Sequence, residues 1–304
     1  MTDQGKKIGF ADCGVYNGVI AGQLQELGWE VAWPPKITSK TITLGSAHSP
    51  EMICFPFKVT LGTIIEQIQS GVKNILVYNS QGHCRFSHFH NLYSHTLKEL
   101  GLECNLLLID RRKPLSSIRN AAKNNPGNLK IAAILFKAWR RLLRAERKLE
   151  MKYSQGRKKV ILVGEAYSTI VPELNHHLRE RLLNCGIATS APALFSHYFL
   201  KKHHLQPRTA EDAEAHELLN APIAGCAFES VRNTIAAAGQ GFHGIIHLYP
   251  LTCMPETTVS PLVDSIARAR KLPLLKFEID ENLSPLNVET RIETFAEIIN
   301  NRRS

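Results

Sequence analysis

The chain has 304 residues, 44% of them hydrophobic, and a formal net charge of +10 at pH 7. This length allows two α/β domains of about 150 residues each, and no stretch of the sequence is long and apolar enough to span a bilayer. The N-terminus is a poor signal peptide, so we expect a cytoplasmic protein whose seven cysteines are reduced thiols or metal ligands rather than disulfides.

The first half of the chain alternates strand and helix patterns. Strands are predicted at KIGFA, WEVAWP, NILVYN and CNLLLID, and helices over VYNGVIAGQLQEL and over residues 56–69 and 90–100. In the helix predicted over residues 56–69, Pro56 stands in a favoured first-turn position, and Gly71 follows the end of the helix. A polar loop is expected before this helix. The continuous apolar run NILVYN is typical of a strand buried on both faces of a parallel sheet.

Residues 115–156 are expected to form a basic helical bridge, broken only at NNPGN. Between residues 130 and 159 there are eleven Lys or Arg and two Glu, which accounts for most of the net charge. Such a segment could bind an acidic partner, phosphates or nucleic acid, or simply form a solvated helix face. Nucleic acid ranks last, because aromatic residues do not alternate with the basic ones as they do in single-strand binders.

The second half repeats the alternation. Strands are predicted at KKVILVGEA, GIIHLYP and LPLLKFEID, and helices at PELNHHLRERLLNCG, PALFSHYFLKKHH, AFESVRNTIAAAG, TVSPLVDSIARAR and LNVETRIETFAEIINNRR. Repeated strand–helix units predict an α/β protein with two lobes, each built on a parallel sheet flanked by helices. We assign the lobes to residues 1–114 and 157–304.

Three cysteines stand where a strand gives way to a helix: Cys54, Cys84 and Cys253. Ligands of open parallel sheets bind beyond the carboxyl ends of the strands. Free amide groups and the helix dipole stabilise a thiolate, or an anionic thiolate-bound cluster, at a helix N-terminus. We therefore predict that these cysteines hold a metal centre in a cleft between the two lobes.

Other residues near this edge leave alternatives open. Cys13 and Cys226 could approach the site, whereas Cys104 and Cys185 are expected to pack as small hydrophobes. Histidines at positions 83, 88, 90 and 95 make three thiolates and one imidazole on zinc chemically possible. Glu165, which follows a predicted strand, could be a site acid, cap a helix or pair with an arginine. Glu256 lies in a first helical turn, where the helix dipole alone favours a carboxylate.

Three motifs, in this order, resemble those of a known family. The segment SPEMICFPFKVTLG resembles a glutamate–cysteine–proline–lysine–glycine signature, formed here by Glu51, Cys54, Pro56, Lys58 and Gly62. GHCRF, with Cys84 and Arg85, resembles a glycine–cysteine–arginine motif, and YPLTCMPE, with Cys253, resembles a cysteine–methionine–proline motif after a strand. These motifs are similar to those of the 2-hydroxyacyl-CoA dehydratases and of the related proteins that depend on acyl-CoA dehydratase activators.

The resemblance implies an oxygen-sensitive [4Fe–4S] redox protein. Cys54, Cys84 and Cys253 would be the cluster ligands, and Lys58 and Arg85 would lie beside the cluster. It also implies a small substrate that is reduced or dehydrated, a homodimer or heterodimer, and an ATP-hydrolysing activator that delivers low-potential electrons. The activator must be another chain, because this sequence has no GxxxxGK[ST] phosphate-binding loop.

Two points stay open in the sequence. The fourth iron could be exposed to water or substrate, or be bound by Cys13, Cys226 or a histidine, and no catalytic residue is assigned. The chain could be a dehydratase-like lyase or the reductase component of an ATP-dependent system. The competing hypothesis is a non-redox protein whose cysteines bind zinc or act as a structural anchor.

Overall fold

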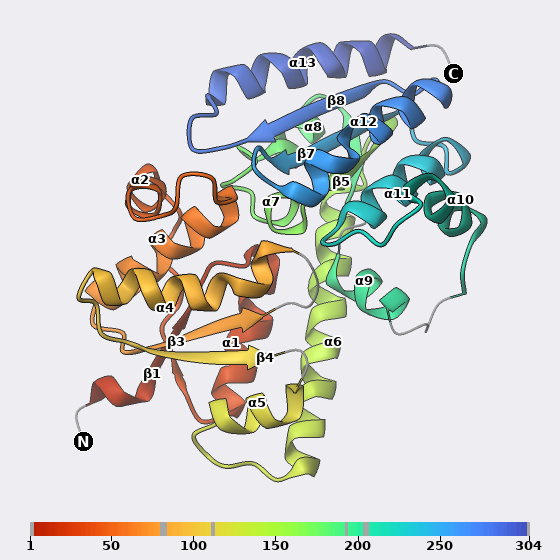
Figure 1. Cartoon of the computed structure of the whole chain (residues 1–304). Coiled ribbons are helices and arrows are strands. Elements are labelled where there is room, and N and C mark those ends of the chain that lie inside the picture. The colour runs from red at the N-terminus through yellow and green to blue at the C-terminus, as the bar shows by residue number, and fades with distance from the viewer. Residues whose placement is uncertain (1–2, 80–83, 111–112, 192–193, 203–206, 303–304) are drawn as a thin grey trace. The chain divides into compact units, whose positions relative to one another are not determined.

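The computed structural model describes residues 3–79, 84–110, 113–191, 194–202 and 207–302. The protein is an α/β protein with two four-stranded parallel sheets flanked by helices (Figure 1). The chain divides into two compact units, Met1–Ala145 and Glu146–Ser304. The boundary between the units falls inside α6 (Asn128–Tyr153), the helix that carries most of the basic segment.

The first unit contains the sheet β2-β1-β3-β4, in which every neighbouring pair is parallel. Its strands are β1 (Lys7–Phe10), β2 (Glu30–Val31), β3 (Asn74–Asn79) and β4 (Asn105–Asp110). Its α-helices before α6 are α1 (Asn17–Glu26), α2 (Ser39–Ala47), α3 (Phe55–Gln69), α4 (Phe89–Glu99) and α5 (Pro114–Ala121). Short 3-10 helices are η1 (Asp3–Lys6), η2 (Gly14–Tyr16) and η3 (Arg85–His88).

Helices cover both faces of this first sheet. Alternate residues of a strand point to opposite faces, so Ile75 and Val77 of β3 pack against α3 and α4. Leu76 and Tyr78 pack on the other face, against α1, α5 and α6. The apolar run of β3 is therefore buried on both sides, as its sequence predicted.

The helices α2 and α3 touch through their backbones. A Cβ added at Gly62 of α3 would stand 2.0 Å from the carbonyl oxygen of Thr41, and one added at Gly45 of α2 would stand 1.7 Å from that of Lys58. Neither position can hold a larger side chain without moving the helices apart. Gly62, part of the first motif, is thus a helix-crossing residue.

The second unit contains the parallel sheet β6-β5-β7-β8. Its strands are β5 (Lys158–Gly164), β6 (Ile187–Ser190), β7 (Gly244–Pro250) and β8 (Leu274–Ile279). Its helices after α6 are α7 (Ala166–Ile170), α8 (Leu178–Asn184), α9 (Phe195–Lys202), α10 (Ala210–Leu219), α11 (Ala227–Gly239), α12 (Met254–Ala269) and α13 (Pro285–Asn301).

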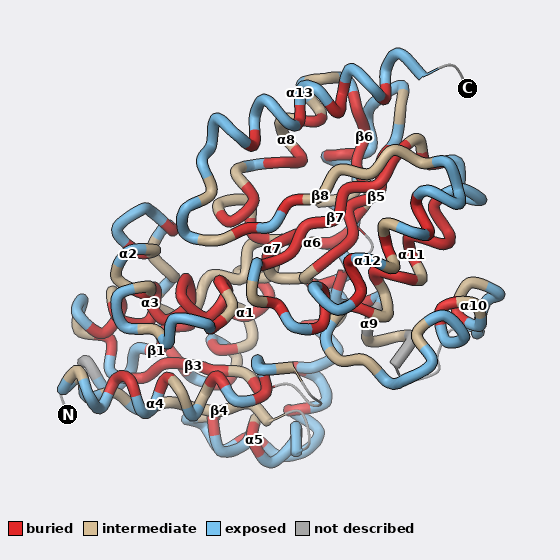
Figure 2. The backbone as a smooth tube through the Cα atoms, turned by 45° about the horizontal axis from the view of Figure 1, so that its top comes forward, coloured by how far each residue is buried: buried red, intermediate tan, exposed pale blue. Residues whose placement is uncertain are grey.

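This second sheet is also covered on both faces. Ile161 of β5 and Ile245 of β7 pack against α11 and α12. Gly244 faces the opposite way, where an added Cβ would meet Ile299 and Phe295 of α13. Figure 2 shows β7 buried along its length, whereas one side of α13 is exposed.

The sequence predicted most of these elements, and the differences have local causes. The predicted bounds of α3, β3, α11 and β7 agree with the structure to within a residue. The helix predicted from Pro172 begins only at Leu178, because His176 and His177 adopt left-handed backbone conformations. Four short elements, α2, α7, β6 and α10, were not predicted, and capping boxes at Thr38 and Thr209 begin two of them.

Among the residues that the structure describes, none of the helices combines the length and the apolar composition that a bilayer crossing requires.

Candidate functional site

The predicted metal-ligating cysteines all occupy N-cap positions. Cys54 is the N-cap residue of α3 and Cys253 that of α12, and in both helices a proline lies in the first turn. Cys84 precedes the four-residue helix η3 rather than α4 itself. In the chain, Cys84 follows β3 and Cys253 follows β7, so both come after the carboxyl ends of parallel strands, as predicted.

A hydrogen bond joins the loops that carry Cys54 and Cys84. Arg85 Nη1 donates to the backbone carbonyl oxygen of Met52 at 2.5 Å, which ties the residue after Cys84 to the loop before Cys54. Arg85 is exposed, whereas Lys58, in the first turns of α3, is 8% exposed. Arg85 therefore positions the two cysteine loops. The glycine of its motif, at position 82, lies outside the described residues.

An aromatic cluster lies between α3, which Cys54 caps, and α4. Phe57 stacks on Tyr93 with 4.9 Å between the ring centroids, and the edge of Phe89 meets Phe57 at the same distance. Phe86, two residues after the second cysteine, contacts Phe89 edge to face. These packed rings form an apolar aromatic cluster next to the two loops that carry Cys54 and Cys84.

Cys13, the N-cap residue of η2, lies beside a core of the same unit. Its Sγ donates to the carbonyl oxygen of Ala11 at 3.3 Å. Burial, and then the charge of Asp12, raises the pKa of Cys13 to about 12, so this thiol stays protonated at neutral pH. The raised pKa disfavours the thiolate form of Cys13, which is the form that binds a metal.

In the second unit, the N-termini of α11 and α12 lie side by side. Ser230 Oγ in the first turn of α11 donates to Glu256 Oε1 in the first turn of α12 at 3.1 Å, and both residues are buried. Gly225, just before α11, has a φ of +64° and lies against Pro255 of α12, because a Cβ there would stand 3.3 Å from Pro255 Cγ. These two contacts hold the starts of the helices together.

Cys226 and Cys253 are the N-cap residues of these two adjoining helices. Sequence spacing did not reveal this relation, because 26 residues, including α11 and β7, separate the two cysteines in the chain. The signal that could have found it is the repeated pattern of a cysteine directly before an amphipathic helix. At the starts of helical segments, the first unit thus carries Cys13, Cys54 and Cys84, and the second unit carries Cys226 and Cys253.

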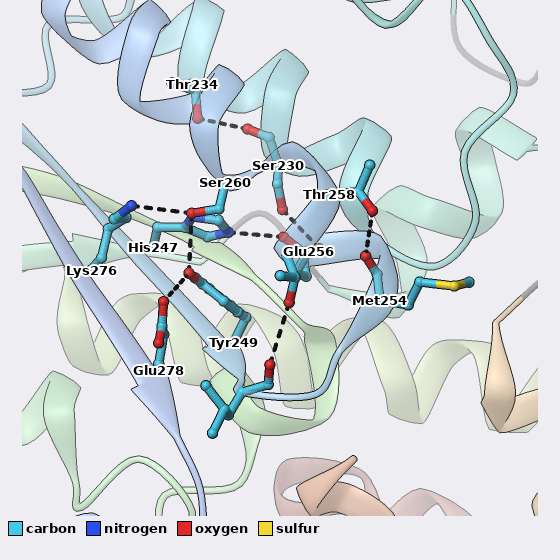
Figure 3. Close-up of polar contacts among 12 residues, drawn as sticks. Ser230, Thr234, His247, Tyr249, Met254, Glu256, Thr258, Ser260, Lys276 and Glu278 are labelled. Atoms are coloured by element: carbon cyan, nitrogen blue, oxygen red, sulfur yellow. Dashed lines mark hydrogen bonds and ion pairs between the residues drawn. The ribbon is translucent and has the colours of Figure 1, made fainter. Parts of the chain in front are cut away.

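The side chain of Glu256, in the first turn of α12, is hydrogen-bonded to a buried histidine of β7. His247 Nε2 lies 2.9 Å from Glu256 Oε2, and both residues are 0% exposed (Figure 3). His247 points to α12 because odd-numbered residues of β7 face α11 and α12. Glu256 accepts from Ser230 as well, so its carboxylate fixes the helix start on which Cys253 sits.

A second polar chain continues along α12 (Figure 3). The hydroxyl of Tyr249 donates to Glu278 Oε1 at 2.7 Å and lies 3.0 Å from Ser260 Oγ. Lys276 Nζ donates to Ser260 at 3.2 Å and to Asp264 Oδ2 at 2.7 Å. Burial is the main reason that the pKa of Tyr249 rises to about 12.

The structure makes Glu165 a helix cap. Its carboxylate accepts from the backbone N–H groups of Tyr167 and Ser168, both at 2.8 Å, and from Ser168 Oγ at 2.6 Å. Burial raises the pKa of Glu165, the hydrogen bonds from Ser168 and Tyr167 oppose that rise, and the charge of Glu256 adds to it. Of the roles that the sequence leaves open for Glu165, helix capping is the one that its hydrogen bonds support.

The described part of the chain holds no group of three or more His, Cys, Asp or Glu side chains that could bind a metal ion. Cys54 and Cys84 belong to the first unit, and Cys226 and Cys253 belong to the second. No disulfide joins any of the seven cysteines, and Cys104 packs against the α3–α4 core as predicted. A centre that uses the three predicted ligands, Cys54, Cys84 and Cys253, would need thiolates from both units.

No family model matches the chain, and no curated protein matches its sequence. The resemblance noted in the motifs therefore stays a hypothesis, and the local chemistry of the cysteines is the basis for assigning a function.

Proposed function

We propose that this chain is a [4Fe–4S] redox protein whose ligands include Cys54, Cys84 and Cys253. The observation that carries the proposal is the repeated placement of cysteines at N-cap positions: two of the three lead into the long helices α3 and α12. The amide groups and dipole of a long helix stabilise an anionic thiolate–cluster assembly. The proposal puts the cluster in a cleft between the lobes, because its thiolates come from both units.

The surrounding residues fit this group chemically. Lys58 is buried in α3 and Arg85 adjoins Cys84, so both add positive charge near an anionic centre. The rings of Phe57 and Phe89 place apolar surface beside the cysteine loops of the first unit. When bound, a [4Fe–4S] cluster supplies one-electron transfer at a potential that such charge and burial tune.

Cys226 is our candidate for the fourth thiolate. It caps α11 beside the start of α12, whereas the Cys13 thiol is held protonated by burial. With Cys226, each unit would contribute two sulfurs to a four-cysteine ligand set. Without it, one iron would stay open to water or to a small substrate.

The proposal includes a partner that supplies electrons. An ATP-hydrolysing activator would reduce the cluster, since this chain has no phosphate-binding loop of its own. The reduced cluster would then serve the reduction or dehydration of a small molecule, in a homodimer or in a heterodimer with a related chain.

Anaerobic purification with iron and sulfide analysis tests the proposal. We expect a brown protein with about four irons and four sulfides per chain, and loss of most iron in Cys253→Ala. Cys104→Ala is the matched control, because that cysteine directly precedes β4 and so lies at the edge of the sheet opposite to the carboxyl ends of the strands. Its iron content should equal that of the wild type.

A second set of variants separates the ligand hypotheses. Cys226→Ser should lower the iron content or change the electron paramagnetic resonance spectrum if Cys226 is a ligand, and Cys13→Ser should change neither. A colourless wild-type protein with one zinc per chain would replace the redox proposal by the zinc alternative. A protein with neither metal would refute both.

A further inference from the structure

The helix α6 is fixed to the first unit by one face. Ile131, Ile134 and Ala138 are buried on that face, and Ile134 belongs to the core formed with β1 and α1. Arg141 Nη2 pairs with Glu26 of α1 at 2.7 Å, and Lys137 Nζ reaches the same carboxylate at 3.2 Å. These contacts set the rotation of α6, so the side chains on its opposite face point to solvent.

Large apolar side chains occupy that opposite face at a regular interval. Leu129, Phe136 and Leu143 follow one another at seven-residue spacing and are 89%, 63% and 40% exposed. Seven residues are two helical turns, so these side chains lie along one line, which is the pattern of a helix that packs against another helix. Single exposed apolar residues need no explanation, but a regular row of them does.

Arginines flank this row. Arg140 and Arg144 are exposed, and the Arg140 guanidinium lies over the ring of Phe136, 6.0 Å from its centroid. The two acidic residues of α6 are both engaged elsewhere: Glu146 is buried and accepts from the Ser196 N–H, and Glu150 pairs with Arg179 at 2.9 Å. The row is therefore bordered by positive charge that the acids of α6 do not neutralise.

We propose that this face of α6, formed by Leu129, Phe136, Arg140, Leu143 and Arg144, binds an acidic amphipathic helix of a partner protein. The apolar row supplies the buried seam, and the arginines select glutamate or aspartate beside it. Aromatic and arginine side chains are the residue types enriched in protein interfaces. The inference rests on α6 alone and does not require a metal cluster.

Two other occupants are disfavoured by charge and chemistry. A second copy of the chain would bring the arginines of both copies together across a two-fold contact, where like charges repel. Nucleic acid would use the arginines, but phosphate contacts make no use of a row of leucine and phenylalanine side chains.

A designed peptide tests the proposal on the full chain. The probe is a labelled helix of about three heptads with leucine at the a and d positions and glutamate at the e and g positions, and binding is followed by fluorescence anisotropy. The double variants Phe136→Ser/Leu143→Ser and Arg140→Glu/Arg144→Glu should each weaken binding at least about tenfold. Arg141 is left unchanged, since it holds α6 to α1.

Control variants test whether the peptide binds to this face of α6 or binds through nonspecific hydrophobic or electrostatic attraction. Leu286→Ser changes a leucine on α13 that is 72% exposed, and Lys36→Glu/Lys98→Glu makes the same change in net charge elsewhere. Both should bind the peptide as the wild type does, and a peptide with lysine in place of glutamate should not bind. Circular dichroism checks that every variant is folded.

Three results would overturn the proposal. The first is absence of peptide binding, or binding that the α6 variants do not weaken. The second is a wild-type dimer that Phe136→Ser/Leu143→Ser converts to a monomer, which would assign the face to a second copy. The third is DNA binding that is lost in Arg140→Glu/Arg144→Glu and retained in the serine variant, which would assign it to nucleic acid.

Discussion

Two glutamates at helix starts, Glu165 and Glu256, have different roles in this protein. Glu165 caps α7 through three hydrogen bonds, whereas Glu256 in the first turn of α12 is held by His247 and Ser230. Cys253, three residues before Glu256, stands at the same helix start, so the carboxylate supports a thiol that we propose as a ligand. The role of each carboxylate follows from its partners and not from its residue type.

The raised pKa of Glu165 predicts how stability depends on pH. The folded state binds the proton more tightly than the unfolded chain, so the free energy of unfolding should fall as pH rises from about 4.5 through the raised pKa. Glu165→Gln keeps an oxygen acceptor for the α7 cap but has no proton to lose, and it should flatten this part of the curve.

Chemical denaturation at a series of pH values measures the effect. The control is Glu217→Gln, a change at an exposed residue of α10 that should leave the pH dependence as it is in the wild type. Curves of the same shape for wild type and Glu165→Gln would contradict the prediction.

The buried pair of His247 and Glu256 makes a second prediction. Glu256→Ala leaves His247 and Ser230 without their partner in the core and should lower the free energy of unfolding by about 3–5 kcal/mol. Ser230→Ala removes one hydrogen bond to a charged group and should cost about 1.5–3 kcal/mol.

Urea denaturation of each variant measures these losses in the free energy of unfolding. Thr258→Ala, at an exposed position of α12, is the reference and should change stability by less than about 0.5 kcal/mol. If Glu256→Ala is no more harmful than Thr258→Ala, the pair does not support the α12 start.

At the scale of elements, the close contact of α2 and α3 explains one motif residue without reference to function. Gly62 is needed because the backbone of α2 occupies the space where its Cβ would be. The contact also places α3, and with it Cys54, against a helix that the sequence pattern did not predict. A glycine in a motif can thus serve the scaffold that holds a neighbouring cysteine.

Gly62→Ala should destabilise the protein by about 3 kcal/mol, because the added methyl group forces α2 and α3 apart. Gly18→Ala is the matched control, since it lies in α1 with no atom within 4 Å of an added Cβ. That change should stabilise α1 by about 0.5–1 kcal/mol. Thermal and urea unfolding of the two variants should therefore shift in opposite directions, and a shift in the same direction would argue against the helix contact.

At the scale of the whole molecule, the proposed ligands come from two independently packed units. Each unit has its own parallel sheet and its own cores, and each has cysteines at the starts of helical segments. The cluster that we propose would stabilise the folded chain, because the unfolded chain does not present the ligands Cys54, Cys84 and Cys253 together.

Metal removal under anaerobic conditions should consequently lower the thermal midpoint of the wild-type chain by at least about 5 °C. The same chelator treatment should not change the midpoint of Cys253→Ala, which lacks one of the proposed ligands. Equal midpoints for the loaded and the metal-free wild type would mean that the bound metal does not link the two units.

Much of the fold could be predicted where the signals are local. The strands β3 and β7 could be predicted from their apolar runs, and the start of α3 could be predicted from Pro56. β6 was missed because its four residues form a strand only by pairing with β5. α2 and α10 were missed because short helices with capping boxes carry little hydrophobic periodicity.

By itself, the sequence determined the α/β class, the parallel sheets and the cysteines that precede helices, since apolar periodicity and capping residues act between near neighbours. Only the tertiary structure decided which helix starts adjoin, which carboxylates are buried and which face of α6 is exposed. Those properties depend on contacts such as Ser230–Glu256 and Arg141–Glu26, between residues far apart in the chain. Such contacts form when distant segments pack together, and local sequence patterns do not predict them.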